Sequence, residues 1–588
     1  MTVNAALGLL RPPVPAELTP DDLWDAYAVE VFAHAGMPAV DVTDLDALPP
    51  IVVVSRAPSL EAVDALSDWV RAGGQLLVVG DPGPLAGMAG VSVGESRTDG
   101  HVVWAADAEW LPEPTGGVHA WGGVTLRLEG AAPVAHWTDV RGGVGDVAAT
   151  VQRVGAGQIV VIGVDAWQSI VRIQQGFPIY GNGRPAADGT APFDDDILRC
   201  EDGLALSFER DRGMAPGVAP FAEPFEYDHP PTAAAPVFDR PHADIWREVI
   251  IGAVSWLAEQ AEVVLPWLFY WPAGVEAVAH MSHDSDGNAD PMAAAALDAF
   301  ADAEVRVTWC VLHPGGYGPG TYRAIAAAGH ETAFHYNAMG DTDLDVWGEQ
   351  QFKEQLDWLR DTTGVDRVVT NKNHYTRWEG WADFYGWCER AGIQIDQSRG
   401  PSKQGVIGFP FGTCHLGFPM AGPDEGGRLF DVLMMPLHAQ DLWWTGVVEN
   451  REVILSGALE HNGVAHFLFH GRNMLRHPEI ADAIRSTAEL ARGRGIPWWT
   501  SEQLNAWERV RRSVRIEASW PDPDVLRLDV TSEAAIDPAA IVLPGLDVRR
   551  TWIADEGTVR IATRNGRAVV ELACTMPAGA TTLTVRGA

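Results

Sequence analysis

The pattern of hydrophobic and polar positions predicts alternating strands and helices in the first part of the chain. Residues 51–54 form a short apolar run, typical of a buried parallel strand. Apolar residues then recur at helical spacing over 60–70, until Gly73 and Gly74 end the helix, and 75–80 read as the next strand. A strand, a helix and a strand in this order are typical of a βαβ unit. Residues 1–265 are therefore predicted to form an open, flavodoxin-like α/β domain.

Residues 266–512 repeat a different pattern, in which apolar strand-like segments end in charged or polar residues and alternate with helical segments. These strand ends carry Asp284 and Asp286, His335, His374, Asp396, and His470. In a (β/α) barrel the carboxyl ends of successive parallel strands meet at one face. The pattern therefore predicts a distorted (β/α) barrel whose polar strand ends converge.

Residues 513–588 alternate apolar and polar positions, and Asn565-Gly566 is a hairpin-turn signal. We expect a small β-sandwich-like domain there. The prediction for the whole chain is a multidomain α/β protein with domain boundaries after residues 265 and 512.

The net charge of the chain argues against some classes of binding partner. The chain has 79 acidic and 42 basic residues, a formal net charge of −37, and no basic block. Nucleic acid and anionic membrane surfaces are therefore not expected as partners. No apolar run is long enough to span a bilayer and no secretory signal is evident, so a cytoplasmic location is expected. The five cysteines lie far apart without a CxxC pair, which argues against disulfides and thiolate zinc sites. A homo-oligomer is left open.

The segment around Asp284 and Asp286 is the first candidate for chemistry. Two carboxylates two residues apart at a strand end repel each other unless a cation or a proton transfer uses them. Taken alone, the segment is also typical of a turn with solvated acids. His335, on a later strand, can complete an Asp/His site for a divalent ion with open positions for water and substrate.

Two motifs carry a resemblance to a known family. His283-Asp284-Ser285-Asp286 and Gly329-His330-Glu331-Thr332-Ala333-Phe334-His335-Tyr336 resemble motifs of the polysaccharide deacetylases, the NodB-homology or carbohydrate esterase group. The resemblance covers about 240 residues and implies a metal-dependent hydrolase that removes an acyl group, foremost acetyl, from an N- or O-acylated carbohydrate. Residues 1–265 resemble the class I glutamine-amidotransferase fold, but no cysteine precedes Cys200, so its nucleophile is absent.

The resemblance implies a metal site built from few residues. Asp284 would be the general base and Asp286 a metal ligand, although these two roles can be exchanged. His335 would be the first metal histidine. The family's second histidine corresponds to Met339, so His374 is the candidate for the third ligand. The ion is expected to be one divalent cation, foremost Zn²⁺, with other divalent ions left open.

The remaining roles are also implied by the resemblance or by position. His470 would be the general acid, with Asp396 orienting it, and Lys372 or Arg377 would hold the base. Tyr336 or a backbone N–H would stabilise the oxyanion. Trp443 and Trp444, which follow Gln440-Asp441 in an expected loop, are candidates for stacking on a sugar.

Two alternatives remain at this stage. The absence of a histidine at Met339 suits a catalytically inactive, carbohydrate-binding or scaffold protein. The same hydrolytic chemistry also suits a non-sugar amide, because the motifs encode hydrolysis and not the leaving group.

Overall fold

The computed structural model describes most of the chain, as residues 6–11, 23–37, 39–56, 58–105, 116–138, 143–188, 190, 197–214, 236–339, 347–443 and 445–587. The chain divides into two compact units. The first unit comprises Met1–Val171, Ile245–Gly274 and Arg509–Ala588, and the second comprises Arg172–Asp244 and Val275–Glu508. Residues 172–244, grouped with the N-terminal domain from sequence, thus pack with the second unit.

The first unit contains the parallel strands that the apolar runs predict. Helix α2 (Leu60–Arg71) is the predicted helix and connects strands β3 and β4. The parallel strands are adjacent in the order β2-β1-β3-β4-β11. Their bounds are β2 (Ala39–Asp41), β1 (Leu7–Leu10), β3 (Ile51–Val54), β4 (Gln75–Val79) and β11 (Gly157–Ile162). All residues of β3 and β4 are buried, which explains their continuous apolar sequence. This unit also holds α1 (Ala28–His34) and most of α3 (Ala166–Gln175) and α4 (His242–Gln260).

The same sheet continues with antiparallel strands that the sequence pattern did not predict. They are β5 (Val91–Ser96), β6 (Asp99–Trp104), β7 (Val118–Trp121), β8 (Val124–Leu128), β9 (Ala132–Thr138) and β10 (Val144–Val154). The first three residues of β10 are exposed and only its middle is buried, so its apolar pattern is incomplete. The sheet is therefore mixed, which corrects the expectation of a simple open α/β sheet.

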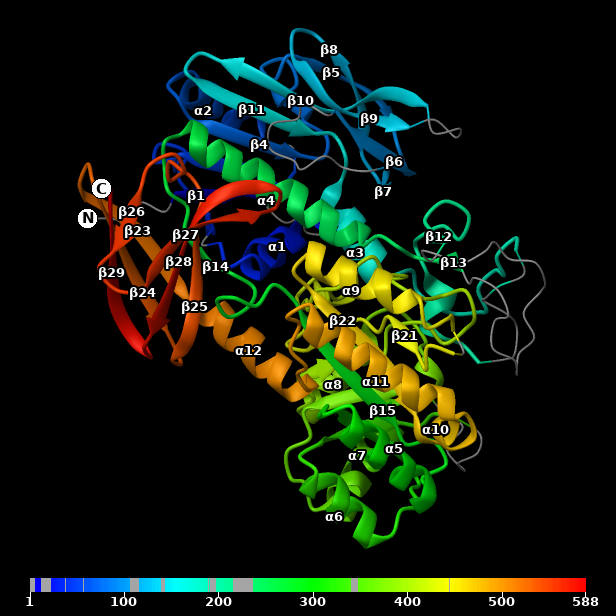
Figure 1. Ribbon diagram of the computed structural model, residues 1–588. Coiled ribbons are helices and arrows are strands. Elements are labelled where there is room, and N and C mark those ends of the chain that lie inside the picture. The colour runs from blue at the N-terminus through cyan, green and yellow to red at the C-terminus, as the bar shows by residue number, and fades with distance from the viewer. Residues whose placement is uncertain are drawn as a thin grey trace. The chain divides into compact units, whose positions relative to one another are not determined.

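The C-terminal strands, in orange to red in Figure 1, belong to two four-stranded antiparallel sheets, of orders β23-β24-β29-β26 and β14-β25-β28-β27, in which β14 comes from the middle of the chain. The bounds are β14 (Trp267–Leu268), β23 (Arg515–Asp522), β24 (Val525–Ser532), β25 (Ile536–Leu543), β26 (Trp552–Ala554), β27 (Thr558–Arg564), β28 (Arg567–Met576) and β29 (Gly579–Gly587). Asn565 and Gly566 both have positive φ and join β27 to β28, as the hairpin signal predicts.

The second unit is built on a curled, all-parallel sheet of eight strands in the order β20-β19-β18-β17-β16-β15-β22-β21. The bounds are β15 (Val278–Asp284), β16 (Thr308–Leu312), β17 (Glu331–Tyr336), β18 (Thr370–Asn373), β19 (Ile395–Asp396), β20 (Leu433–Met434), β21 (Ala439–Gln440) and β22 (Val464–His470). The prediction of parallel strands alternating with helices is confirmed, but the sheet is a curled half-barrel and not the distorted (β/α) barrel expected from the sequence.

Helices follow most of these strands, and Figure 1 shows α5, α6, α7 and α11 around β15. The bounds are α5 (Asp290–Asp302), α6 (Pro319–Ala327), α7 (Glu349–Thr363), α8 (Asp383–Ala391), α9 (Asn450–Glu460), α10 (Gly471–Arg476), α11 (Pro478–Gly493) and α12 (Ser501–Ser513). The strand residues pack on both faces, as Trp309, Phe334 and Phe467 illustrate, each with no measurable exposure. With the interior filled, the polar strand ends are held on a rigid support.

The amino ends of three strands are tied together by one half-buried carboxylate. Glu331 accepts hydrogen bonds from the hydroxyl groups of Thr308 and Thr370, and from the backbone N–H of Glu502 at the start of α12. This cluster lies at the face opposite the carboxyl strand ends, where polar residues serve stability.

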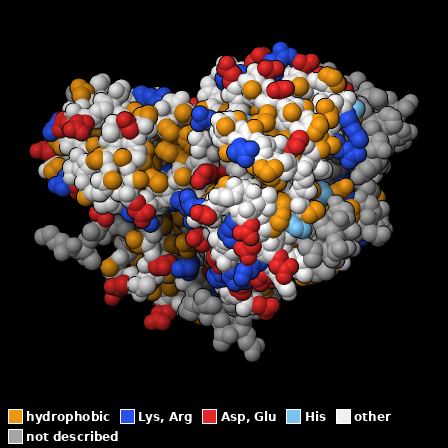
Figure 2. Space-filling view, turned by 90° about the horizontal axis from the view of Figure 1, so that it is seen from below, with side chains coloured by type: hydrophobic (Ala, Val, Ile, Leu, Met, Phe, Trp, Pro, Cys, Tyr) orange, Lys and Arg blue, Asp and Glu red, His pale blue; other side chains and the backbone are white. Residues whose placement is uncertain are grey.

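The surface in view in Figure 2 carries acidic and basic side chains side by side, without a single large basic area. All five cysteines are buried and free. Within the ranges that the structure describes, no helix combines the length and apolar character needed to cross a bilayer.

Candidate functional site

The acidic pair lies where β15 ends. Asp284 is the last residue of β15 and is almost fully buried, whereas Asp286 lies in the following turn and is partly exposed. Gly287 and Asn288 both have positive φ, so the chain reverses directly after Asp286. The turn thus holds both carboxylates at the carboxyl end of the sheet.

Two histidines from neighbouring strands face this pair, each fixed by its far ring nitrogen. Nδ1 of His335, on β17, donates to the carbonyl oxygen of Lys372 at 2.9 Å. Nδ1 of His374, directly after β18, lies 3.0 Å from Oδ1 of Asn337. Because the amide nitrogen of Asn337 donates to the carbonyl oxygen of His313, Oδ1 is the acceptor and Nδ1 of His374 is the donor. In the neutral rings, both Nε2 atoms therefore present a lone pair to the site, as metal-binding histidines do.

The spacing of these atoms suits one divalent ion. Nε2 of His335 lies 3.3 Å from Oδ1 of Asp286, and Nε2 of His374 lies 3.5 Å from Oδ2 of the same carboxylate. One ligand atom from each of the three residues lies within 4.8 Å of the others. Ligand atoms about 2.1 Å from one ion at tetrahedral angles are about 3.4 Å apart. Asp286, His335 and His374 can therefore share a cation.

Several buried polar atoms at this place lack hydrogen bonds to other described residues. They are Oδ1 of Asp284, Oδ1 of Asp286 and Nε2 of His335. Each is an acceptor when its side chain is in its ordinary form at neutral pH, and buried acceptors without a donor are costly. A cation held by Asp286, His335 and His374 would satisfy Oδ1 of Asp286 and Nε2 of His335, so the donor set fits a metal on this observation as well as on spacing.

Lys372 lies beneath the acidic pair. Its side chain has no exposed area, and Nζ lies 3.4 Å from Oδ2 of Asp284. Burial alone would raise the pKa of Asp284, but electrostatic interaction with the side chains of His335, Lys372 and His470 outweighs it and lowers that pKa. Asp284 is thus held as a carboxylate, ready to accept a proton.

His470, the last residue of β22, lies on the other side of the carboxylates. Its Nε2 is 3.9 Å from Oδ2 of Asp284 and 3.8 Å from Oδ2 of Asp286. Its Nδ1 pairs at 2.8 Å with Oδ2 of Asp441, which also accepts a hydrogen bond from Asn473. Burial would lower the pKa of His470, but Asp441 above all, with Asp286 and Asp284, raises it to about 9. The ring is therefore an imidazolium at neutral pH.

The residue that orients His470 differs from the one expected from sequence. Asp396 bonds with the hydroxyl of Ser398 at 2.6 Å and the amide of Asn371 at 2.8 Å, within the strand layer. Asp441, directly after β21, pairs with His470 instead, and its backbone adopts a positive φ of 55°. Because β21 is adjacent to β22 in the sheet and β19 is not, Asp441, unlike Asp396, lies at the end of a neighbouring strand. Asp441 follows a strand of only two residues, and so short a strand has no hydrophobic pattern that would have identified Asp441 from the sequence.

These residues open into a cavity of about 570 Å³. It is lined by Asp284, Asp286, His374, Asp441 and His470, and also by Arg199, Tyr375, Thr376, Ser402, Gln440, Trp443, Arg472, Asn473, Arg476 and His477. Trp443 packs on the His477 ring at 4.1 Å between centroids, and Tyr375 is 41% exposed. The cavity is therefore lined both by the Asp and His side chains of the candidate site and by the aromatic rings of Trp443 and Tyr375. Trp444 lies outside the described residues.

Three other predicted residues are placed away from the acidic pair. The hydroxyl of Tyr336 donates to the carbonyl oxygen of Gly348 at 3.1 Å and does not line the cavity. Arg377 pairs with Glu379 at 2.7 Å, so Lys372, and not Arg377, contacts the carboxylate of Asp284. The backbone N–H of Met339 donates to Oδ1 of Asn337, the same atom that fixes His374.

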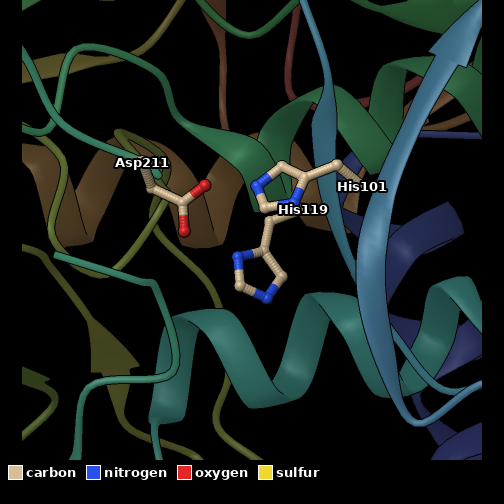
Figure 3. A group of neighbouring side chains, drawn as sticks. All are labelled: His101, His119 and Asp211. Atoms are coloured by element: carbon tan, nitrogen blue, oxygen red, sulfur yellow. The ribbon is translucent and has the colours of Figure 1, made fainter. Parts of the chain in front are cut away.

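Two further groups of His, Cys and Asp side chains have ligand atoms close together. In the second unit, Asp244 accepts hydrogen bonds from the hydroxyl of Thr413 and the backbone N–H of Cys414. Nε2 of His415 is bonded to the carbonyl oxygen of His461, so these atoms serve packing. Figure 3 shows the other group, in which His101 and His119 face each other across β6 and β7. Asp211 is also drawn but belongs to the second unit, so no site is assigned there.

Comparison with known proteins gives no family assignment. No protein-family model and no curated protein sequence matches the chain. Among solved structures, a Mycobacterium smegmatis protein described as a polysaccharide deacetylase is 17% identical over 41% of this chain and 93% of its own, with a TM-score of 0.32. The T48 deacetylase is 14% identical over 39% of this chain and 91% of its own, with a TM-score of 0.25.

Glycosidases also occur among these neighbours. The β-galactosidase of Rahnella sp. R3 is 19% identical, with a TM-score of 0.23, over 28% of this chain. The chain spans 29% of that enzyme's length. TM-scores this low carry no argument about activity, so the function is argued from the site alone.

Proposed function

We propose that the protein is a metal-dependent hydrolase that removes an acyl group, foremost acetyl, from an N- or O-acylated carbohydrate. The observation that carries the proposal is the convergence of Asp284, Asp286, His335, His374 and His470 from four parallel strands, with buried acceptors left without hydrogen bonds. Asp286, His335 and His374 would hold one divalent ion, with Zn²⁺ the first candidate because of the nitrogen ligands. Such an ion supplies electrophilic activation of water and of an acyl carbonyl.

The carboxylate of Asp284 is placed to act as general base. It accepts the proton of the water whose oxygen attacks the acyl carbon. The charge of Lys372, 3.4 Å away, keeps Asp284 ionised before the attack. Lys372 is thus a positioning residue that acts through Asp284.

His470 is placed to act as general acid. When the bond between the acyl carbon and the leaving nitrogen or oxygen breaks, Nε2 of His470 donates its proton to the leaving atom. Asp441 holds the ring by Nδ1 and stabilises its positive charge. The products are a carboxylic acid and a free amine or hydroxyl group.

Acetate release from acetylated oligosaccharides, measured with the metal content of the same preparation, tests this proposal. The wild type should contain one divalent ion per chain and release acetate. Asp284→Asn should keep the ion, because Asp286, His335 and His374 are intact, but lose at least about a hundredfold in kcat. Asp298→Asn, on α5 and outside the cavity lining, is the matched control and should behave as the wild type.

The outcomes separate the alternatives. A protein that holds the ion but hydrolyses no acylated substrate would favour the carbohydrate-binding interpretation. Release of acid from acylated amines but from no acylated sugar would favour a non-sugar amide. Full activity of Asp284→Asn would contradict the assigned base.

A further inference from the structure

The cavity carries a second set of charges that the hydrolytic chemistry does not use. Arg472 and Arg476 lie four residues apart on α10, so they share one face of the helix. Both line the cavity that Asp284 and Asp286 also line. Both are exposed, and neither forms an ion pair or a hydrogen bond with another described residue.

Such a pair is unusual in a chain with 79 acidic and 42 basic residues. Some exposed arginines of the second unit have carboxylate partners, as in Arg428 with Glu389 at 2.9 Å and Arg390 with Glu349 at 2.6 Å, whereas Arg323 on α6 has none among the described residues. Arg472 and Arg476 differ from Arg323 in that they lie together at the cavity, where one external anion can contact both guanidinium groups.

A third guanidinium group lies in the same cavity. Arg199 is buried, with 2% of its area exposed, and its guanidinium is 5.5 Å from the ring centre of Tyr375. A buried arginine is held in place more firmly than an exposed one and makes the positive charge of the cavity a fixed feature. The arginines that line the cavity therefore come from two segments of the chain, α10 and the segment that contains Arg199.

The formal charges that line the cavity balance, in contrast to those of the whole molecule. The three guanidinium groups offset the carboxylates of Asp284, Asp286 and Asp441. The chain as a whole carries −37. An anionic ligand is therefore repelled less at this cavity than the net charge of the molecule implies.

We propose that the substrate is an acidic carbohydrate, whose carboxylate, sulfate or phosphate group binds Arg472 and Arg476 while a sugar ring lies against Trp443. Guanidinium groups bind such anions through paired N–H donors. This inference rests on the proposed function, because it names the substrate class of the same site.

The test compares matched substrates. The probes are an acetylated oligogalacturonide, its carboxyl-reduced neutral counterpart, and the neutral form carrying sulfate. The wild type should show a kcat/KM about tenfold or more higher for either acidic probe, mainly through KM, and the preference should weaken in high salt. The double variant Arg472→Ala/Arg476→Ala should bring the ratio between acidic and neutral probes close to one.

Arg323→Ala is the matched control, because Arg323 is exposed on α6 and does not line the cavity. It should keep the wild-type ratio. Equal kcat/KM for acidic and neutral probes in the wild type would overturn the inference and leave the hydrolase proposal intact. A preference that persists in the double variant would also overturn it.

Calorimetric binding of the deacetylated probes separates this inference from the failure of the proposed function. If no probe is hydrolysed but the acidic one binds more tightly, and the double variant loses that difference, the anion site stands and the hydrolase proposal falls. If neither probe is hydrolysed and both bind equally or not at all, both proposals are wrong.

Discussion

At the scale of single residues, the candidate site depends on contacts between side chains that come from different strand ends. Asp284, Asp286 and His335 belong to two motifs, and their atoms lie within 3.5 Å of one another in the pairs Asp284–His335 and Asp286–His335. Asp441 belongs to no motif, and only the adjacency of β21 and β22 places it against His470. Asp396 was expected to orient His470, and this was wrong for the same reason. The residues at one strand end do not indicate which strands are its neighbours in the sheet.

The pairing of Asp441 with His470 predicts the pH profile. Asp441→Asn removes the negative charge that keeps the pKa of His470 near 9, so the imidazolium form is lost at lower pH. The alkaline limb of kcat should therefore move to lower pH, and kcat at pH 8 should fall at least about tenfold. Asp396→Asn is the control. If Asp396→Asn shifts that limb and Asp441→Asn does not, the sequence-based assignment was right.

The charge of Lys372 should affect the pH dependence of activity through the general base, Asp284. Lys372→Met keeps the length of the side chain but removes the charge that lowers the pKa of Asp284. The acidic limb of kcat/KM should move to higher pH, because Asp284 then takes up a proton more easily. Recovery of the wild-type limb in Lys372→Arg would support a charge effect. An unchanged acidic limb in Lys372→Met would contradict it.

At the scale of elements, the apolar runs predict the buried strands well and the half-exposed ones poorly. β3, β15 and β22 are buried over almost their whole length, and each is evident as an apolar run. The strands of the antiparallel part of the first unit are partly exposed, and tertiary pairing defines them more than their own sequence. The two-residue strands β19, β20 and β21 are too short for any periodic pattern.

The pairing of β15 with β22 predicts a loss of stability in mild acid. His280 and His466 face each other across these strands, and burial lowers the pKa of His280 to about 4. Because folding favours the neutral ring, its contribution is full above about pH 6.5 and is lost as pH falls towards 4. For His280 the loss amounts to about 3 kcal/mol.

Chemical denaturation followed by circular dichroism between pH 7.5 and 4.5 measures this effect. His280→Gln should reduce the dependence of the free energy of unfolding on pH, because one fewer proton is taken up on unfolding. His136→Gln, a change at a partly exposed histidine of the first unit, should leave it unaltered. A pH dependence that is the same in His280→Gln and the wild type would rule out this origin.

At the scale of the whole molecule, net charge is the property that the sequence defines completely. A formal charge of −37 means that folding brings together many like charges, and salt screens their repulsion. Raising NaCl from 0.05 to 0.5 M should therefore raise the midpoint of thermal unfolding by several degrees. Sucrose at equal osmolality is the control for general solute effects. A midpoint that falls with salt would show that ion pairs outweigh the repulsion.

The central claim is that Asp286, His335 and His374 hold one divalent ion, and calorimetric titration of metal-free protein with Zn²⁺ tests it most directly. We predict one ion per chain for the wild type and for His136→Ala, and an affinity at least about a hundredfold weaker for His374→Ala. His374 is the decisive residue, because the sequence offers Met339 at the position of the family's second histidine. Equal Zn²⁺ affinity in His374→Ala and the wild type, or no binding to either, would contradict the account.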